Sequence, residues 1–210
     1  MKIWVLMVSA LLMCGMSFYL WTRDIGKIPK PIQIYSIVSI VVVIGITYVL
    51  CTIYEQNSIV FNLKRISILS ILWPVAYIDF FEYKIPNKFI ILGLIYRVLI
   101  LFIELFANAD IVFITVISEV IATVALLISM CLCRICIKNS IGYGDIKLFM
   151  VIGLMLGLEG VWGAVFMTLL VSFFIALFLL LSKKKKRTDS IPFGPAIAFG
   201  TFLSVFLTGM

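Results

Sequence analysis

The chain has 210 residues, of which 64% are hydrophobic and only 13% charged. Soluble domains are about half apolar and a quarter charged, so this composition excludes a soluble globular domain and predicts an all-α, polytopic transmembrane helix bundle. The net charge of +7 does not indicate a nucleic-acid partner, because most basic residues lie in short loops between apolar runs, where membrane topology accounts for them.

About eight apolar runs are expected to form membrane segments, given that roughly 20 residues span a bilayer. The first run has no small-residue cleavage site before Arg23, so we interpret it as a retained helix rather than a signal peptide. The sixth run reaches only about 20 Å at 1.5 Å per residue, short of the hydrocarbon core. The expected helices are Ile3–Trp21, Ile32–Tyr54, Ile66–Phe81, Lys88–Phe106, Ile111–Ile137, Ile146–Leu158, Val161–Ser182 and Pro192–Thr208.

Basic residues are distributed unevenly between the expected loops. Most of the 17 Lys and Arg residues follow the first, third, fifth and seventh runs, including the cluster Lys183–Arg187. The opposite side has Lys2 and, in an expected loop over residues 55–65, Lys64 and Arg65. The positive-inside rule therefore predicts that the first set lies in the cytoplasm and that both termini lie outside. The cluster Lys183–Arg187 fits a topology anchor better than the alternative, a site for anionic lipid.

Two carboxylates lie at the ends of apolar runs. Asp79 ends the third run, and Ile85-Pro86-Asn87 follows, where the residue before proline avoids helical backbone. Asp145 precedes the sixth run directly, in Gly142-Tyr143-Gly144-Asp145. An acid at the end of a membrane helix indicates a functional site, although Asp145 could instead cap the helix that follows it. The loop charges place both acids at the cytoplasmic face, where a carboxylate pair can share one proton and activate water against a peptide carbonyl.

These stretches together resemble the prepilin peptidases, or type 4 leader peptidases, of the Gly-x-Gly-Asp membrane aspartic proteases. The family's first Asp is followed at a fixed spacing by Ile-Pro-Asn, and its Gly-x-Gly-Asp by an apolar residue, Lys and Leu, as in Gly142–Leu148. Pro192-Phe193-Gly194-Pro195 is similar to the motif that opens the last helix in bacterial members. The resemblance covers about Ile66 to the C-terminus. We therefore expect N-terminal membrane helices over 1–65 and a catalytic membrane domain over 66–210, in one continuous bundle.

The resemblance implies a multi-pass aspartic endopeptidase of the cytoplasmic membrane. It would cleave the short basic leader from prepilin-like proteins on the cytoplasmic side, for a type IV pilus, competence or secretion system, and it implies no cofactor. Asp79 and Asp145 would be catalytic. Gly142 and Gly144 would admit substrate backbone, while Lys147 would meet the substrate or, as we favour, mark the membrane interface. The loop after the first run is too short for the Cys-x-x-Cys domain of longer members, which argues against N-methyltransferase activity.

A proton-coupled membrane transporter is the alternative from another class, because intramembrane acids can carry protons. It accounts for Arg97 and Glu119, which we expect to pair near mid-membrane, with Glu104 as the competing partner. It does not account for Ile-Pro-Asn or Pro-Phe-Gly-Pro, so we rank it below the peptidase. A catalytically silent assembly factor is the third interpretation.

The cysteines Cys131, Cys133 and Cys136 include one Cys-x-x-Cys spacing. There is no second such pair and no histidine in the chain, whereas a closed zinc site needs about four ligands. We interpret these cysteines as membrane-boundary thiols and predict no metal site.

Overall fold

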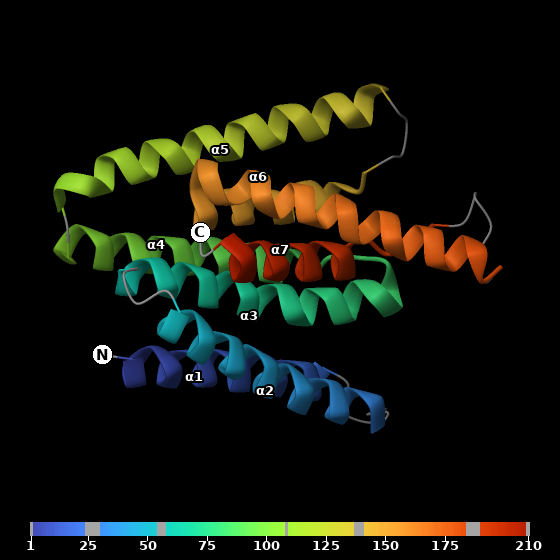
Figure 1. Ribbon diagram of the computed structural model, residues 1–210, viewed down its shortest axis with the longest axis horizontal. Helices are drawn as coiled ribbons and strands as arrows, with labels where there is room; N and C mark the ends of the chain where they lie inside the picture. Colours follow the sequence, from blue (N-terminus) through green and yellow to red (C-terminus); the bar gives the residue numbers. More distant parts are fainter. Residues whose placement is uncertain are drawn as a thin grey trace.

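The computed structural model describes residues 2–23, 30–53, 58–107, 109–136, 141–183 and 190–208. The expected loops also include Asp24, Lys27, Lys138 and Lys184–Arg187, which lie outside these residues. The described residues form only helices and turns (Figure 1), and the helices are α1 (Lys2–Arg23), α2 (Lys30–Ile53), α3 (Ile59–Glu82), α4 (Asn87–Ala107), α5 (Ala109–Cys136), α6 (Tyr143–Leu181) and α7 (Gly194–Thr208).

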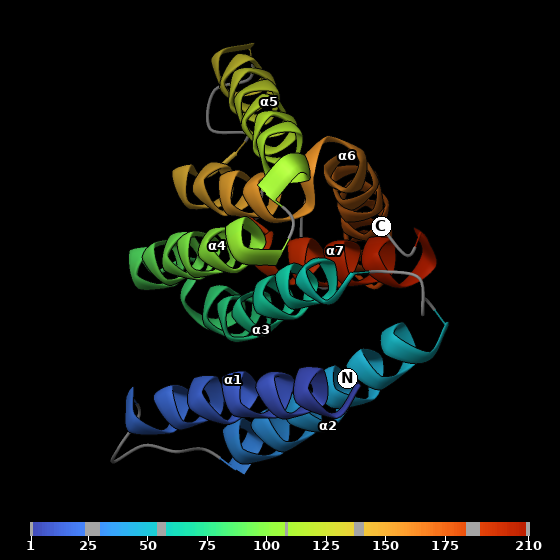
Figure 2. The same cartoon turned by 90° about the vertical axis from the view of Figure 1, so that its left-hand side faces the viewer.

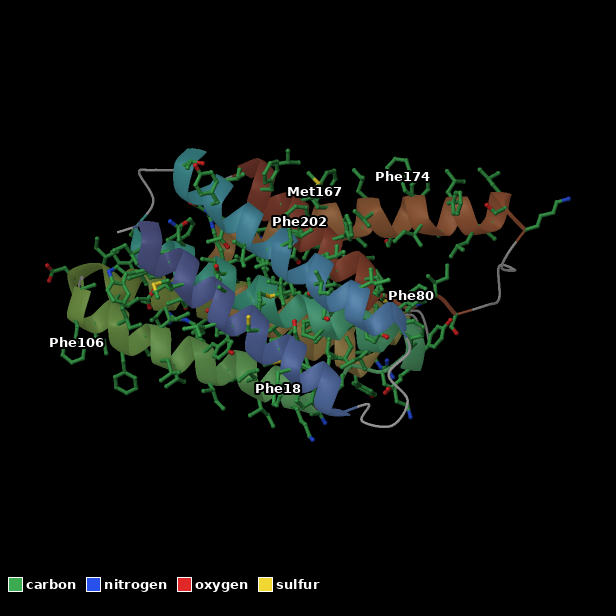
Figure 3. All side chains as sticks on the ribbon, turned by 90° about the horizontal axis from the view of Figure 1, so that it is seen from below. Phe18, Phe80, Phe106, Met167, Phe174 and Phe202 are labelled. Atoms are coloured by element: carbon green, nitrogen blue, oxygen red, sulfur yellow. The ribbon has the colours of Figure 1, made fainter. Side chains whose placement is uncertain are left out.

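The prediction of an all-α membrane bundle is confirmed in its main features. Helices α3, α4, α5 and α6 are long and apolar enough to cross a membrane, by length and composition. Large apolar side chains point outward along the helices, among them Phe18, Phe106 and Phe174 (Figure 3). An outward apolar surface of this kind suits a lipid environment rather than water.

Helix α3 lies at the centre of the bundle. Figure 2 shows α1 and α2 on one side of it, α4 and α7 beside it, and α5 and α6 on the other side. Ile68, Ile71 and Val75 of α3 are fully buried, and they share one core with Leu148 and Ile152 of α6. The helix that leads to Asp79 and the helix that follows Asp145 are therefore held in one buried core.

Helix α3 begins earlier than the sequence predicted. Ser58 is its N-cap, and the Ser58 hydroxyl accepts the Phe61 N–H at 3.2 Å. Lys64 and Arg65, which we expected in an exposed loop, consequently lie within the helix and are 4% and 0% exposed. The expected boundary after Arg65 falls inside α3, and the division into two regions stays a prediction.

The loop prediction failed because Lys64 has distant acidic partners. Arg97 Nε donates to Glu119 Oε2 at 2.7 Å, as the expected pair requires, and Lys64 Nζ donates to Glu119 Oε1 at 2.6 Å. Glu104, the competing partner, contacts both cations, with Arg97 Nη1 at 2.9 Å. All four side chains are less than a tenth exposed, so the pair is part of a buried network of two positive and two negative charges.

The described residues form seven helices, not clearly the eight expected segments. The sixth and seventh expected runs are both part of α6, which bends at Gly157 (φ 67°, ψ −170°), as its two limbs in Figure 2 show. A positive φ of this kind strongly favours glycine. The Leu158 N–H that follows the bend donates to the Ser118 hydroxyl of α5 at 3.2 Å. Gly157 lets the chain change direction, and the Ser118 hydroxyl gives the Leu158 N–H a partner at the bend.

Candidate functional site

Asp79 lies in the last turn of α3 and is 5% exposed. The helix ends at Tyr83, which has left-handed backbone (φ 54°, ψ 34°) and donates its N–H to the Asp79 carbonyl at 2.9 Å. The Asp79 carboxylate turns toward α7 and accepts the Gly194 N–H at 2.7 Å. Because Gly194 is the first residue of α7, the carboxylate meets a helix N-terminus, where free N–H groups and the helix dipole stabilise an anion.

Glycine is required at position 194 by this close approach. A Cβ on Gly194 would lie 2.8 Å from Asp79 Cβ and 2.9 Å from Asp79 Oδ2, closer than real Cβ contacts. The first turn of α7 is closed by the Ile197 N–H, which donates to the Phe193 carbonyl at 3.0 Å. The stretch Pro192-Phe193-Gly194-Pro195 therefore holds the start of α7 against Asp79.

Asp145 lies in the first turn of α6 and is half-buried. Gly142 is the N-cap of this helix, and its N–H donates to Asp145 Oδ2 at 3.2 Å. A Cβ on Gly142 would lie 2.9 Å from the same oxygen. The alternative interpretation of Asp145 as a capping residue is thus correct as a description of the helix start, and it leaves the second carboxylate oxygen available for chemistry.

The two carboxylates share one cavity. Its volume is about 500 Å³, and Asp79 and Asp145 line it together with Tyr83, Ile141, Gly142, Ser190, Ile191, Pro192 and Phe193. The cavity lies where α3 ends and where α6 and α7 begin. Figure 1 shows these three helix termini at the same end of the bundle. Two carboxyl groups on one cavity, each held by a backbone N–H, can take up and release protons next to a group bound in that cavity.

The Ile-Pro-Asn segment contacts the Gly-x-Gly-Asp segment directly. Lys147 Nζ donates to Asn87 Oδ1 at 3.1 Å, and a Cβ on Gly144 would lie 3.0 Å from Ile85 Cβ. Of the three residues expected to meet substrate, only Gly142 lines the cavity, whereas Gly144 and Lys147 join the two segments. These contacts place Ile85-Pro86-Asn87 as a link between the helix end at Asp79 and the helix start at Asp145.

Some cavity residues had no signal in the sequence. Tyr83, Ile141 and Ser190 lie in segments that showed only the absence of an apolar run, and they reach the cavity through the packing of α3, α6 and α7. The cysteines Cys131, Cys133 and Cys136 are exposed near the end of α5, and none of them lines the cavity.

Comparison with known protein families gives a match over more than half of the chain. Residues 66–181, more than half of the chain, match the profile of the type IV leader peptidase family. The matched range contains both carboxylates and the Ile-Pro-Asn segment and ends before Pro192. No curated protein and no solved structure matches the chain.

Proposed function

The chain belongs to the type IV leader peptidase family, and on that premise we propose that it is an aspartic endopeptidase that removes the basic leader of prepilin-like proteins. The observation that carries the aspartic mechanism is the shared cavity of Asp79 and Asp145. In this proposal the two carboxyl groups are catalytic, hold one proton between them and titrate as a pair.

The proposed reaction is hydrolysis of one peptide bond. The dyad accepts a proton from water as the water oxygen bonds to the carbonyl carbon, and it donates its other proton to the carbonyl oxygen. As the tetrahedral intermediate collapses, one of its hydroxyl groups returns a proton to the dyad, the C–N bond breaks and the leaving nitrogen takes a proton from the dyad, which is left with the single proton it began with. The bond from Gly194 N–H keeps Asp79 in place through these steps, and the bond from Gly142 N–H does the same for Asp145.

The substrate would approach from within the membrane. Its apolar helix would lie in the bilayer, and its leader would reach the cavity at the cytoplasmic face of the cytoplasmic membrane, as the basic loops predict. The extended backbone of Gly142 on the cavity wall leaves room for an extended substrate segment. The products would serve a pilus, competence or secretion system.

The transporter alternative is not supported. It accounted for Arg97 and Glu119, and these two residues pair with each other and with Glu104 and Lys64 in the buried network. Paired in this way, Arg97 and Glu119 have a structural explanation and need no transported proton.

Co-expression with a prepilin-like protein from the same cell tests the proposal. We expect a mature product, seen by its mobility on a gel and located by N-terminal sequencing directly after the leader. Mass spectrometry of that product also tests the expected lack of N-methyl transfer. An intact leader on a substrate that has entered the membrane beside well-expressed enzyme would overturn the proposed function.

A further inference from the structure

Helix α5 ends beside the segment that precedes Asp145. Arg134 lies in the last turn of α5, and its guanidinium carbon lies 3.8 Å from the centroid of the Tyr143 ring. The same guanidinium donates from Nη1 to the Ile141 carbonyl. Arg134 therefore holds the residue before Gly142 and the residue after it at the same time.

Holding both neighbours fixes the direction of the Gly142 N–H. Gly142 has no side chain to restrict its backbone, and its N–H is the group that donates to Asp145 Oδ2. Ile141 and Gly142 both line the cavity of the two carboxylates. A shift of the peptide bond between them would move the donor and, with it, the Asp145 carboxylate.

We propose that Arg134 is a positioning residue that orients the Asp145 carboxylate through Ile141, Gly142 and Tyr143. This inference rests on the proposed function, because it assigns Arg134 to the same dyad. A planar guanidinium suits the task, since it stacks on an aromatic face and donates in its own plane to an oxygen. A lysine ammonium has the charge but cannot make both contacts in this geometry.

The competing explanation is that Arg134 acts only as a positive charge that sets membrane topology. Arg134→Lys separates the two explanations, because it keeps the charge and loses the stacked, planar contact. If Arg134 positions Asp145, Arg134→Ala lowers kcat by about 10-fold to 100-fold with KM within about two-fold, and Arg134→Lys recovers only part of the loss. If only charge matters, Arg134→Lys cleaves like wild type, and the inference is wrong.

Ile135→Ala is the matched control, because Ile135 lies in the same turn of α5 and is 75% exposed. It is expected to keep wild-type kcat. All variants are compared at equal amounts of membrane-inserted protein, and the melting temperature of each is measured alongside kcat. A fall in the melting temperature of Arg134→Ala with unchanged kcat would show a purely structural role and would overturn the inference.

A second measurement is independent of cleavage. Hydrogen exchange of the Gly142 amide in the intact protein reports the bond to Asp145, and we expect faster exchange in Arg134→Ala than in wild type or Ile135→Ala. Unchanged exchange would contradict the positioning role even if kcat fell. Asp145→Asn separates this inference from the proposed function. If that variant is inactive while Arg134→Ala has wild-type kcat and exchange, the peptidase proposal survives and only the role of Arg134 is overturned.

Discussion

Replacing Glu119 with Ala is expected to destabilise the protein strongly. The Glu119 carboxylate contacts both Lys64 and Arg97 and is 2% exposed. Its loss leaves two buried cations facing Glu104, so one positive charge loses its counter-charge. Removing one partner of a buried ion pair costs about 3–5 kcal/mol. For a chain of this size that corresponds to a fall of roughly 6–20 °C in melting temperature.

The assay is thermal unfolding of the purified protein in detergent, followed by tryptophan fluorescence. Glu159→Ala is the matched control, because Glu159 is an exposed acid on α6, and its loss should change stability by less than about 0.5 kcal/mol. Replacing Arg97 and Glu119 together with Met leaves Lys64 paired with Glu104, so this double variant should regain much of the lost stability.

Two results would refute this reasoning. In one, Glu119→Ala melts at the same temperature as Glu159→Ala. In the other, the double variant with Met at positions 97 and 119 is no more stable than the less stable of the two variants that each replace only Arg97 or only Glu119. Loss of cleavage with an unchanged melting temperature would instead assign Glu119 a functional role.

Gly194→Ala should lower kcat by at least about 100-fold with little loss of folded protein, because its Cβ would lie 2.9 Å from Asp79 Oδ2; wild-type cleavage would show that this contact is dispensable. Lys147→Ala and Asn87→Ala should each lower kcat/KM by about 3-fold to 10-fold, because each removes the hydrogen bond between these two side chains. The double variant loses the same single bond, so its kcat/KM should be no lower than that of either single variant, and additive losses would contradict the link. Gly200→Val should lower the free energy of unfolding by about 1–3 kcal/mol, because a Cβ there would lie 2.4 Å from the α6 backbone; an unchanged melting curve would exclude this close packing.

The two carboxylates could be found from sequence because the signal is local. An acid at the end of an apolar run is energetically costly. Asp79 and Asp145 are also each adjoined by a recognisable motif, Ile-Pro-Asn after Asp79 and Gly-x-Gly before Asp145. The expected pair of Arg97 and Glu119 followed from a similar argument about depth along two adjacent helices. In each case one energetic cost, that of a charge in an apolar setting, decided the prediction.

Other features depend on distant partners and could not be read locally. The charge of Lys64 just before an apolar run favours a loop, but the acidic partners of Lys64 belong to α4 and α5. The bend at Gly157 depends on Ser118 of α5, which accepts the next N–H. The contacts of Arg134 require the end of α5 to pack beside residues 141–143, and no local pattern indicates that packing.

The central claim is that Asp79 and Asp145 act as one catalytic unit, and the kinetics of Asp79→Asn, Asp145→Asn and the double variant test it most directly. The assay uses purified enzyme in lipid vesicles with a synthetic substrate that has a basic leader ending in glycine and an apolar helix. We predict that each single variant loses at least about 1,000-fold in kcat/KM and that the double variant loses no more than the worse single variant. A single variant within about ten-fold of wild type, at equal amounts of folded protein, would contradict the dyad.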